Sequence, residues 1–217
     1  YKSLDELPEP VDMAVICLNQ YATVEAVESC GRAGVKGVVC NAGGYRETGE
    51  EGDELERQLI AAARKYGLPI IGPNTLGIIN NDANLYCTFY PMRIPQGKIS
   101  IISQSGGVGL TIINLALDEG IGINKFIGVG NCSNFDFADC LDYLENDDST
   151  AVIGVYIEGT RDAGRFVRTA GRVARKKPVV VYKAGRISGA DNYTQTHTGS
   201  SAGSFKLYRD ILHQYGV

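Results

Sequence analysis

The chain has 217 residues, of which 44% are hydrophobic and 21% are charged, a composition typical of a globular protein with one large or two smaller domains. It carries 21 Lys and Arg against 25 Asp and Glu, which gives a formal net charge of -4, and no basic run is present. These features argue against a partner bound by bulk charge, so we expect neither nucleic acid nor an anionic membrane to bind. Any anion must therefore be held by local groups.

Targeting and metal-binding signals are absent from the sequence. No apolar stretch approaches the roughly 20 residues that a membrane-spanning helix requires, and the first residues do not resemble a signal peptide, so we expect a cytoplasmic protein. The chain begins with Tyr1 instead of Met, which suggests a fragment of a longer protein. The six cysteines form no CxxC pair and no Cys/His cluster, so no metal site is predicted. Cys17 and Cys40 lie in apolar runs and are expected to be reduced and buried.

The first part of the chain alternates short β-branched runs with helical stretches, a pattern typical of βαβ units. It predicts strands at 11–18, 35–40 and 68–72 and helices at 23–34 and 53–67. An opening strand with a glycine-rich turn is missing from this pattern. We therefore interpret the region as the second half of a Rossmann-like α/β domain.

An irregular stretch at 80–97, with Pro91 and Pro95, is predicted to cross between domains. We place the domain boundary there, with one domain at 1–94 and a second at 95–217.

The second domain repeats the alternation and predicts a flavodoxin-like parallel sheet followed by an amphipathic helix. The expected strands are 98–103, 123–130, 149–159 and 178–185, and the expected helices are 106–120, 136–147, 161–177 and 203–217.

The segment SQSGG at 103–107 lies between a predicted strand and a predicted helix. Backbone N–H groups at a helix N-terminus bind anions, and small residues let an anion approach them. The carboxyl end of a strand in an open α/β sheet is also where ligands bind. Gln104, Ser105, Gly106 and Gly107 are therefore candidate phosphate ligands. The alternative is a tight turn without a ligand.

A histidine and an acid follow two other predicted strands. His197 lies in the polar segment 192–204, and a neutral imidazole is a competent nucleophile toward phosphorus. Glu158 ends the strand 149–159 and, if it faces His197, would accept the Nδ1 proton and leave Nε2 free to attack. The alternatives are an exposed loop histidine and a solvated strand-end acid. His213 is expected to be an ordinary surface residue.

Further glycine-containing loops follow predicted strands at 41–49, 72–77 and 128–131 and are expected to line the same rim, or else to be simple turns. The segment GRAGVKG at 31–37 precedes a strand, so we do not interpret it as a dinucleotide-binding motif.

Seven motifs occur in an order that resembles the α-type portion of the ADP-forming, or nucleoside-diphosphate-forming, acyl-CoA synthetases and, more distantly, the succinyl-CoA synthetase α subunit. They are NAGGYRETGEEG, IIGPNTLGIIN, ISIISQSGGVG, GVGN, YIEG, KPVVVYKAGR and THTGSSAG. The resemblance implies a partial Rossmann-like CoA-binding domain at 1–94 and a flavodoxin-like CoA-ligase domain with a phosphohistidine loop at 95–217. It implies that His197 is phosphorylated, that Glu158 supports it and that Gln104 to Gly107 cap a helix that holds the phosphate.

The resemblance also implies positions near CoA. Asn74 and Gly77 lie in the GPNTLG segment, which resembles the family's segment near the CoA thiol. The other positions lie at strand ends that flank the cofactor, and they are Asn19, Gly43, Gly130 and Asn131. The family's opening strands and glycine-rich loop precede Tyr1 or are missing, and the ATP-grasp module is absent from these residues. We expect an ATP-grasp domain or subunit as partner, with ATP or ADP and Mg²⁺ bound there, and an oligomeric assembly.

The implied reaction interconverts acyl-CoA, phosphate and a nucleoside diphosphate with a small carboxylic acid, CoA and a nucleoside triphosphate, through an acyl phosphate and a phosphohistidine. The alternative is a non-catalytic module that senses CoA or a nucleotide, in a regulatory protein or a protein acetyltransferase. The presence of His197 favours the synthetase, because a silent copy is expected to have lost it. The sequence assigns neither the acyl group nor a preference for ADP or GDP.

Overall fold

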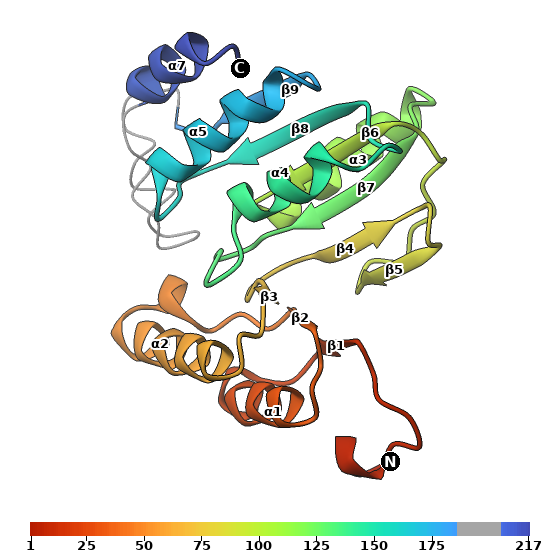
Figure 1. Ribbon diagram of the computed structural model, residues 1–217, viewed down its shortest axis with the longest axis vertical. Helices are drawn as coiled ribbons and strands as arrows, with labels where there is room; N and C mark the ends of the chain where they lie inside the picture. Colours follow the sequence, from red (N-terminus) through yellow and green to blue (C-terminus); the bar gives the residue numbers. More distant parts are fainter. Residues whose placement is uncertain (186–204) are drawn as a thin grey trace.

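Alternating strands and helices build two sheets in the computed structural model, which describes residues 1–185 and 205–217 (Figure 1). The N-terminal part of the chain forms one lobe around the first sheet. The rest of the described chain forms a second lobe around the other sheet. The α/β class and the two successive sheets expected from the sequence are confirmed.

The first lobe is a three-stranded parallel sheet in the order β1-β2-β3. Its elements are η1 (Leu4–Glu6), β1 (Met13–Ile16), α1 (Gln20–Arg32), β2 (Gly37–Cys40), η2 (Arg46–Thr48), α2 (Glu50–Lys65) and β3 (Ile70–Ile71). Helix α1 packs against α2, and both helices share an apolar core with the strands. Helix α1 begins earlier than predicted because Asn19 caps it, its Oδ1 accepting a hydrogen bond from the backbone N–H of Ala22 at 3.0 Å.

The second lobe is a six-stranded mixed sheet in the order β5-β4-β7-β6-β8-β9. Its elements are β4 (Gly77–Asn80), β5 (Leu85–Thr88), β6 (Ile99–Ser103), α3 (Gly106–Asp118), β7 (Ile123–Gly128), α4 (Phe137–Glu145), β8 (Val152–Ile157), α5 (Ala163–Ala174), β9 (Val179–Lys183) and α7 (Phe205–Gln214). Strands β6 to β9 run parallel, as predicted, whereas β4 is antiparallel to both β5 and β7.

The hairpin of β4 and β5 differs from the expectation for this part of the chain. Residues 80–97 were expected to be an irregular crossing, but Leu85–Thr88 forms a strand. Strand β4 joins the sheet through β7, with Ile78 opposite Ile127, a partner far along the chain that local sequence patterns do not reveal. The chain thus passes from the first sheet to the second between β3 and β4, before residue 95. The division into domains at 1–94 and 95–217 stays a prediction.

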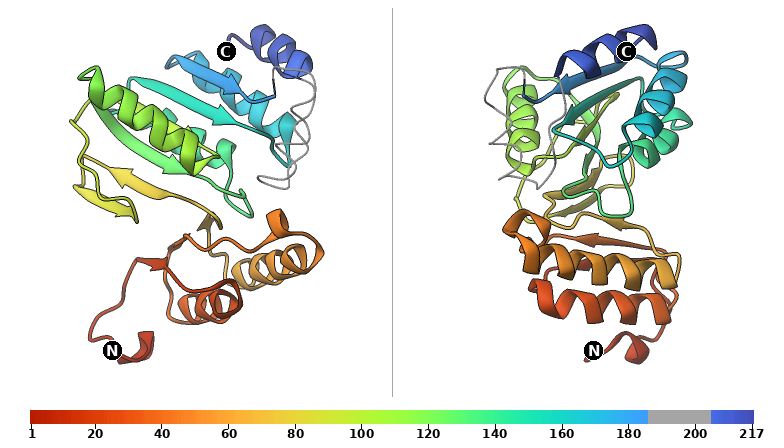
Figure 2. Two further views of the ribbon diagram at one scale, coloured as in Figure 1. Left: turned by 180° about the vertical axis from the view of Figure 1, so that it is seen from behind. Right: turned by 90° about the vertical axis from the view of Figure 1, so that its left-hand side faces the viewer.

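Helices cover both faces of the second sheet, with α3 on one side and α4, α5 and α7 on the other (Figure 2). Because successive strand residues point to opposite faces, Ile101 and Phe126 pack in the core beneath α3. Their neighbours Ile102 and Ile127 pack in the core beneath α4 and α5. This arrangement leaves the ends of the sheet, where the loops lie, as the place for ligands.

The cysteines divide by position. Cys40 is buried, and burial raises the pKa of its thiol to about 11. Cys17 is exposed, so the expectation that it is buried was wrong; β1 is an edge strand and ends at Ile16, one residue earlier.

Among residues 1–185 and 205–217, no group of His, Cys, Asp and Glu is arranged to hold a metal ion. Within the same ranges, every helix is too short or too polar to cross a membrane.

A buried lysine ties the β4–β5 hairpin to the sheet. The side chain of Lys125 on β7 is 4% exposed, and its Nζ lies 3.0 Å from Asp82 Oδ2 and 2.7 Å from Asp147 Oδ2. A hydrogen bond from Ser149 and the ammonium of Lys125 hold the pKa of Asp82 well below its usual range. Burial acts to raise the pKa of Asp147, but hydrogen bonds from Lys125, Thr150 and Ser149 outweigh it and lower that pKa.

Replacing Lys125 with Met should weaken the dependence of stability on acid pH. The two carboxylates have lower pKa values in the folded state, so their contribution is present above the unfolded Asp pKa of about 3.9 and is lost as pH falls through the folded values. In urea unfolding at pH 7, 5 and 3, the wild-type free energy of unfolding should fall more steeply than that of Lys125→Met. Lys98→Met, at an exposed position, is the control. Parallel pH profiles for all three proteins would contradict this assignment.

Candidate functional site

The predicted phosphate-binding segment connects β6 to α3, as expected. Ser105 is the N-cap of α3, and its Oγ accepts a hydrogen bond from the backbone N–H of Val108 at 3.3 Å. Gln104 and Ser105 are buried, whereas Gly107 is exposed. A Cβ added to Gly106 would lie 3.4 Å from the Cβ of Leu76, so the start of α3 lies directly against the GPNTLG segment. Phosphate binding by these four residues stays a prediction.

Gln104 joins the ends of two neighbouring strands. Its side-chain Oε1 accepts hydrogen bonds from the backbone N–H groups of Glu158 at 2.8 Å and Gly159 at 3.1 Å. Its own backbone N–H donates to the carbonyl of Tyr156 at 3.1 Å. The turn that follows β8 is therefore held in place by the residue that precedes the cap of α3.

Glu158 lies in this turn, with 3% of its surface exposed. The Nζ of Lys183, at the end of β9, donates to the carbonyl oxygens of Glu158 at 2.9 Å and Ala184 at 2.7 Å. Burial, followed by the charge of Glu158, raises the pKa of Tyr156 to about 12. His197 lies outside the described residues, so its pairing with Glu158 stays a prediction.

Sequence reasoning missed Lys183, which is 6% exposed. Its signal is a lysine in the strand segment PVVVYKAG, because a lysine in such a run is either exposed at an edge or buried with partners.

Replacing Gln104 with Leu should destabilise the β6–β8 junction. The buried N–H groups of Glu158 and Gly159 would lose their acceptor, at a cost of about 1–3 kcal/mol each. Chemical unfolding should therefore show a loss of roughly 2–4 kcal/mol for Gln104→Leu, allowing for partial relaxation. The control is Gln58→Leu, since Gln58 is exposed on α2 and bonds only Glu54 among the contacts found in the described chain. A loss no larger than in this control would refute the structural role of Gln104.

The GPNTLG segment meets the loops that follow β2 and β7. Asn74 has a left-handed backbone with φ of 57°, and its backbone N–H donates to the carbonyl of Ala42 at 2.7 Å. A Cβ added to Gly43 would lie 3.3 Å from Asn74 Oδ1, and Asn74 Nδ2 donates to Asn131 Oδ1 at 3.4 Å. The structure therefore brings Gly43, Asn74 and Asn131 together, as the sequence led us to expect.

Two of the candidate glycines make close backbone approaches. Gly130 has φ of 51°, and a side chain there would overlap the carbonyl oxygens of Pro73 and Asn74. Gly77 has φ of 108°, and a side chain there would overlap the carbonyl of Cys87 on β5. Glycine is therefore required at both positions by packing, whatever contact either makes with a ligand.

Asn19 is exposed at the start of α1. Its neighbour Gln20 packs against Gly44, where a Cβ would lie 2.9 Å from the Gln20 Cδ. The N-terminus of α1 therefore borders the loop that carries Gly43, and contact of Asn19 with CoA stays a prediction.

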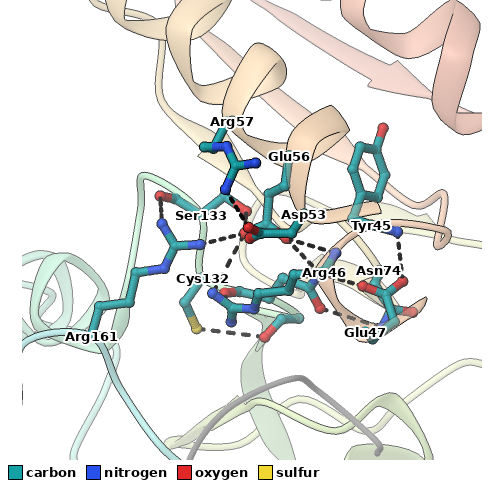
Figure 3. Close-up of polar contacts among 12 residues, drawn as sticks. Tyr45, Arg46, Glu47, Asp53, Glu56, Arg57, Asn74, Cys132, Ser133 and Arg161 are labelled. Atoms are coloured by element: carbon teal, nitrogen blue, oxygen red, sulfur yellow. Dashed lines mark hydrogen bonds and ion pairs between the residues drawn. The ribbon is translucent and has the colours of Figure 1, made fainter. Parts of the chain in front are cut away.

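Asn131 is fully buried and belongs to a polar network between the lobes. Figure 3 shows its neighbours in this network, among them Arg46, Glu47 and Glu56. Asn131 Nδ2 donates to Glu47 Oε2 at 2.6 Å and to Glu56 Oε2 at 3.0 Å. Its backbone carbonyl accepts a hydrogen bond from the guanidinium of Arg46. The side chain thus makes internal contacts, and a contact with CoA or substrate stays a prediction.

Sequence reasoning missed the residues that complete this network, which are Arg46, Glu47, Glu56, Ser133 and Arg161. Glu56 gave no local signal, because α2 carries many acids and most of them are exposed. Arg161 gave only a weak signal, which is that it follows Glu158 by three residues.

The fold and these loops define a two-lobed α/β protein with converging strand-end loops of the CoA-ligase type. A family model described as the succinyl-CoA ligase like flavodoxin domain matches residues 96–217, and one described as the CoA binding domain matches residues 1–81. The chain belongs to the ADP-forming acyl-CoA synthetase family, in its α-type portion. The resemblance drawn from the seven motifs is thereby confirmed.

Relatives match the whole chain but extend well beyond it. The chain is 44% identical to the alpha subunit of acetate–CoA ligase [ADP-forming] II from Pyrococcus furiosus, with 100% of this chain and 47% of the relative aligned. It is 42% identical to acetate–CoA ligase [ADP-forming] I from Archaeoglobus fulgidus, covering 100% of this chain and 32% of the relative. The chain therefore spans less than half the length of these curated relatives.

A solved structure has the same fold along the full chain. It is the dinucleotide forming acetyl-coenzyme A synthetase 1 of Ca. Korarchaeum cryptofilum in complex with phosphate and ADP. The TM-score is 0.94 at 36% sequence identity, with 100% of this chain and 47% of that chain covered.

Proposed function

We propose that this chain is the CoA- and phosphoryl-handling portion of an acyl-CoA synthetase. The enzyme would interconvert acyl-CoA, phosphate and a nucleoside diphosphate with a carboxylic acid, CoA and a nucleoside triphosphate. Related acetate–CoA ligases are named as ADP-forming, and a related structure contains phosphate and ADP, which supports this reaction class.

The observation that carries the proposal is the construction of the turn that holds Glu158. This buried acid lies at the end of β8, fixed by Gln104 from β6 and by Lys183 from β9. The N-terminus of α3 begins two residues after Gln104, so a buried acid with a fixed backbone and a helix N-terminus flank the same strand ends. This pairing suits a phosphorylated side chain, because the helix end offsets phosphate charge and the carboxylate orients an imidazole.

The phosphoryl step is assigned to His197. Its Nε2 attacks the phosphorus of the acyl phosphate, the bond between phosphorus and the acyl oxygen breaks, and the free carboxylate leaves. Glu158 accepts a hydrogen bond from Nδ1–H, which fixes the tautomer and stabilises positive charge on the ring. The N–H groups at Ser105, Gly106 and Gly107 would receive the phosphoryl oxygens. The phosphohistidine then transfers its phosphoryl group to the nucleoside diphosphate.

The CoA step is assigned to the junction of the two lobes. A phosphate oxygen attacks the thioester carbonyl, the carbon–sulfur bond breaks, and CoA leaves as the thiolate and takes up a proton. We place the thiol near Asn74 and Gly77, with Gly130 and Asn131 beside it. We assign Asn19 and Gly43 to the flanking surface.

The remaining components are proposals for the whole enzyme. An ATP-grasp domain or subunit would hold the nucleotide and Mg²⁺, and the substrate would be a small carboxylic acid. The relatives named as alpha subunits support a multi-subunit assembly. We propose a cytoplasmic setting for this reaction.

The decisive test is phosphorylation of His197 in the full-length protein assembled with its ATP-grasp module. Incubation with γ-labelled ATP should give an acid-labile, base-stable label, because a phosphoramidate bond hydrolyses in acid. His197→Ala should lose this label completely.

His213→Ala is the matched control, since His213 is exposed on α7, and it should keep the label. Label retained in His197→Ala would contradict the assignment of the nucleophile. No label on an assembly that binds nucleotide would favour a non-catalytic sensing module instead.

A further inference from the structure

Glu56 stands out among the residues that the proposed chemistry leaves unused. It lies on α2, and its side chain is 1% exposed. Its Oε1 accepts hydrogen bonds from Ser133 Oγ at 2.8 Å and from Arg161 Nη2 at 2.5 Å. Its Oε2 accepts from Asn131 Nδ2 at 3.0 Å and from the backbone N–H of Arg46 at 3.4 Å. The carboxylate thus has about as many donors as its two oxygens accommodate.

These donors come from three loops on both sides of the lobe junction. Arg46 belongs to the loop after β2, Ser133 to the loop after β7 and Arg161 to the loop after β8. Figure 3 shows the two guanidiniums and the serine converging on this one carboxylate. Glu56 therefore connects an element of the first lobe directly to two strand-end loops of the second.

The burial of the Glu56 carboxylate costs free energy that its hydrogen bonds have to offset. Burying an ionised carboxylate costs several kcal/mol unless donors replace the lost water, and removing one partner of a buried pair leaves the other charge uncompensated. Burial and the nearby guanidinium of Arg46 also lower the pKa of Arg161. Two like charges this close require the shared carboxylate between them, so the loops cannot shift without breaking favourable contacts.

From Glu56 the network continues to the candidate CoA residues. Asn131 also donates to Glu47 Oε2 at 2.6 Å, and Glu47 Oε1 accepts from the backbone N–H of Gly44 at 2.7 Å. Asn131 Oδ1 accepts from Asn74 Nδ2 at 3.4 Å. Hydrogen bonds through Asn131 thus connect Glu56 both to the loop beside Gly43 and to the GPNTLG segment.

The turn at Glu158 and Gly159 is held directly by contacts other than those of Glu56, which bonds Arg161 two residues beyond Gly159. Gln104 binds its N–H groups, and Lys183 binds its carbonyl. Loss of the Glu56 carboxylate should therefore disturb the loops around Asn74 more than the site of phosphoryl transfer.

We propose that Glu56 is a positioning residue for the CoA-dependent half of the reaction, holding the loops of both lobes in the spacing that the thiol end of CoA requires. This role rests on the proposed function. Glu56 acts through Asn131 and Arg161 and touches no reacting atom.

The test compares two half-reactions in the full-length enzyme with its ATP-grasp module. In Glu56→Gln, the KM for CoA should rise, or kcat/KM for CoA should fall, by about tenfold or more, because small misplacements of a binding site cost this much. Formation of the phosphohistidine from labelled ATP should keep its wild-type rate.

Glu145→Gln is the matched control. Glu145 is also a buried glutamate, 5% exposed, but it lies on α4 and pairs with Arg172 and Lys176. It should lower the melting temperature while leaving KM for CoA unchanged. Equal changes in KM in the two variants, or a parallel fall of both half-reactions in Glu56→Gln, would overturn the proposal.

Two further measurements keep the proposal separate from the proposed function. If the wild-type protein forms no phosphohistidine, the proposed function fails. Titration of CoA into wild type and Glu56→Gln then still tests the role of Glu56. Binding about tenfold weaker in Glu56→Gln supports that role, and equal binding overturns it. If Glu56→Gln does not fold, Ser133→Ala removes one donor and should weaken CoA binding in the same direction. Unchanged binding in Ser133→Ala would then overturn the proposal.

Discussion

A buried carboxylate joins a helix of the first lobe to two strand-end loops of the second. Glu56 projects from α2 of the first lobe and accepts hydrogen bonds from Ser133 and Arg161 of the second. An ionised side chain is tolerated in such a place only when its oxygens are satisfied, so the helix and the loops have to keep one relative placement. The close packing of Gly130 against the backbone of Asn74 depends on this placement as well, because no side chain fits between the two loops.

The strand ends therefore contain two regions with different direct supports, joined through the loop after β8, where Arg161 bonds Glu56. One surrounds Asn74 and Asn131 and is held by the Glu56 network. The other surrounds Glu158 and is held by Gln104 and Lys183. This division corresponds to the two chemical stages of the proposed reaction, because a thioester and a phosphohistidine need different surroundings. The start of α3, which packs against Leu76, lies between the two regions and is shared by both.

Most of the fold could be predicted from local patterns. Strands such as Ile99–Ser103 and helices such as Ala163–Ala174 were found because their periodicity and flanking residues are local properties. The hairpin at Leu85–Thr88 was missed, since its strand is short and its sheet is completed by β7, far along the chain. The exposure of Cys17 was also missed, because an apolar run does not reveal which strand lies at an edge.

The sequence by itself determined the alternation of strands and helices, the small-residue turn before α3 and the position of Glu158 at a strand end, because propensity and spacing act over a few residues. Only the tertiary structure decided that Glu56 and Lys183 are buried and which groups surround them. Glu56 and Arg161 are 105 residues apart, so no local pattern connects them. The burial of a charge depends on donors that only the packed lobes bring together.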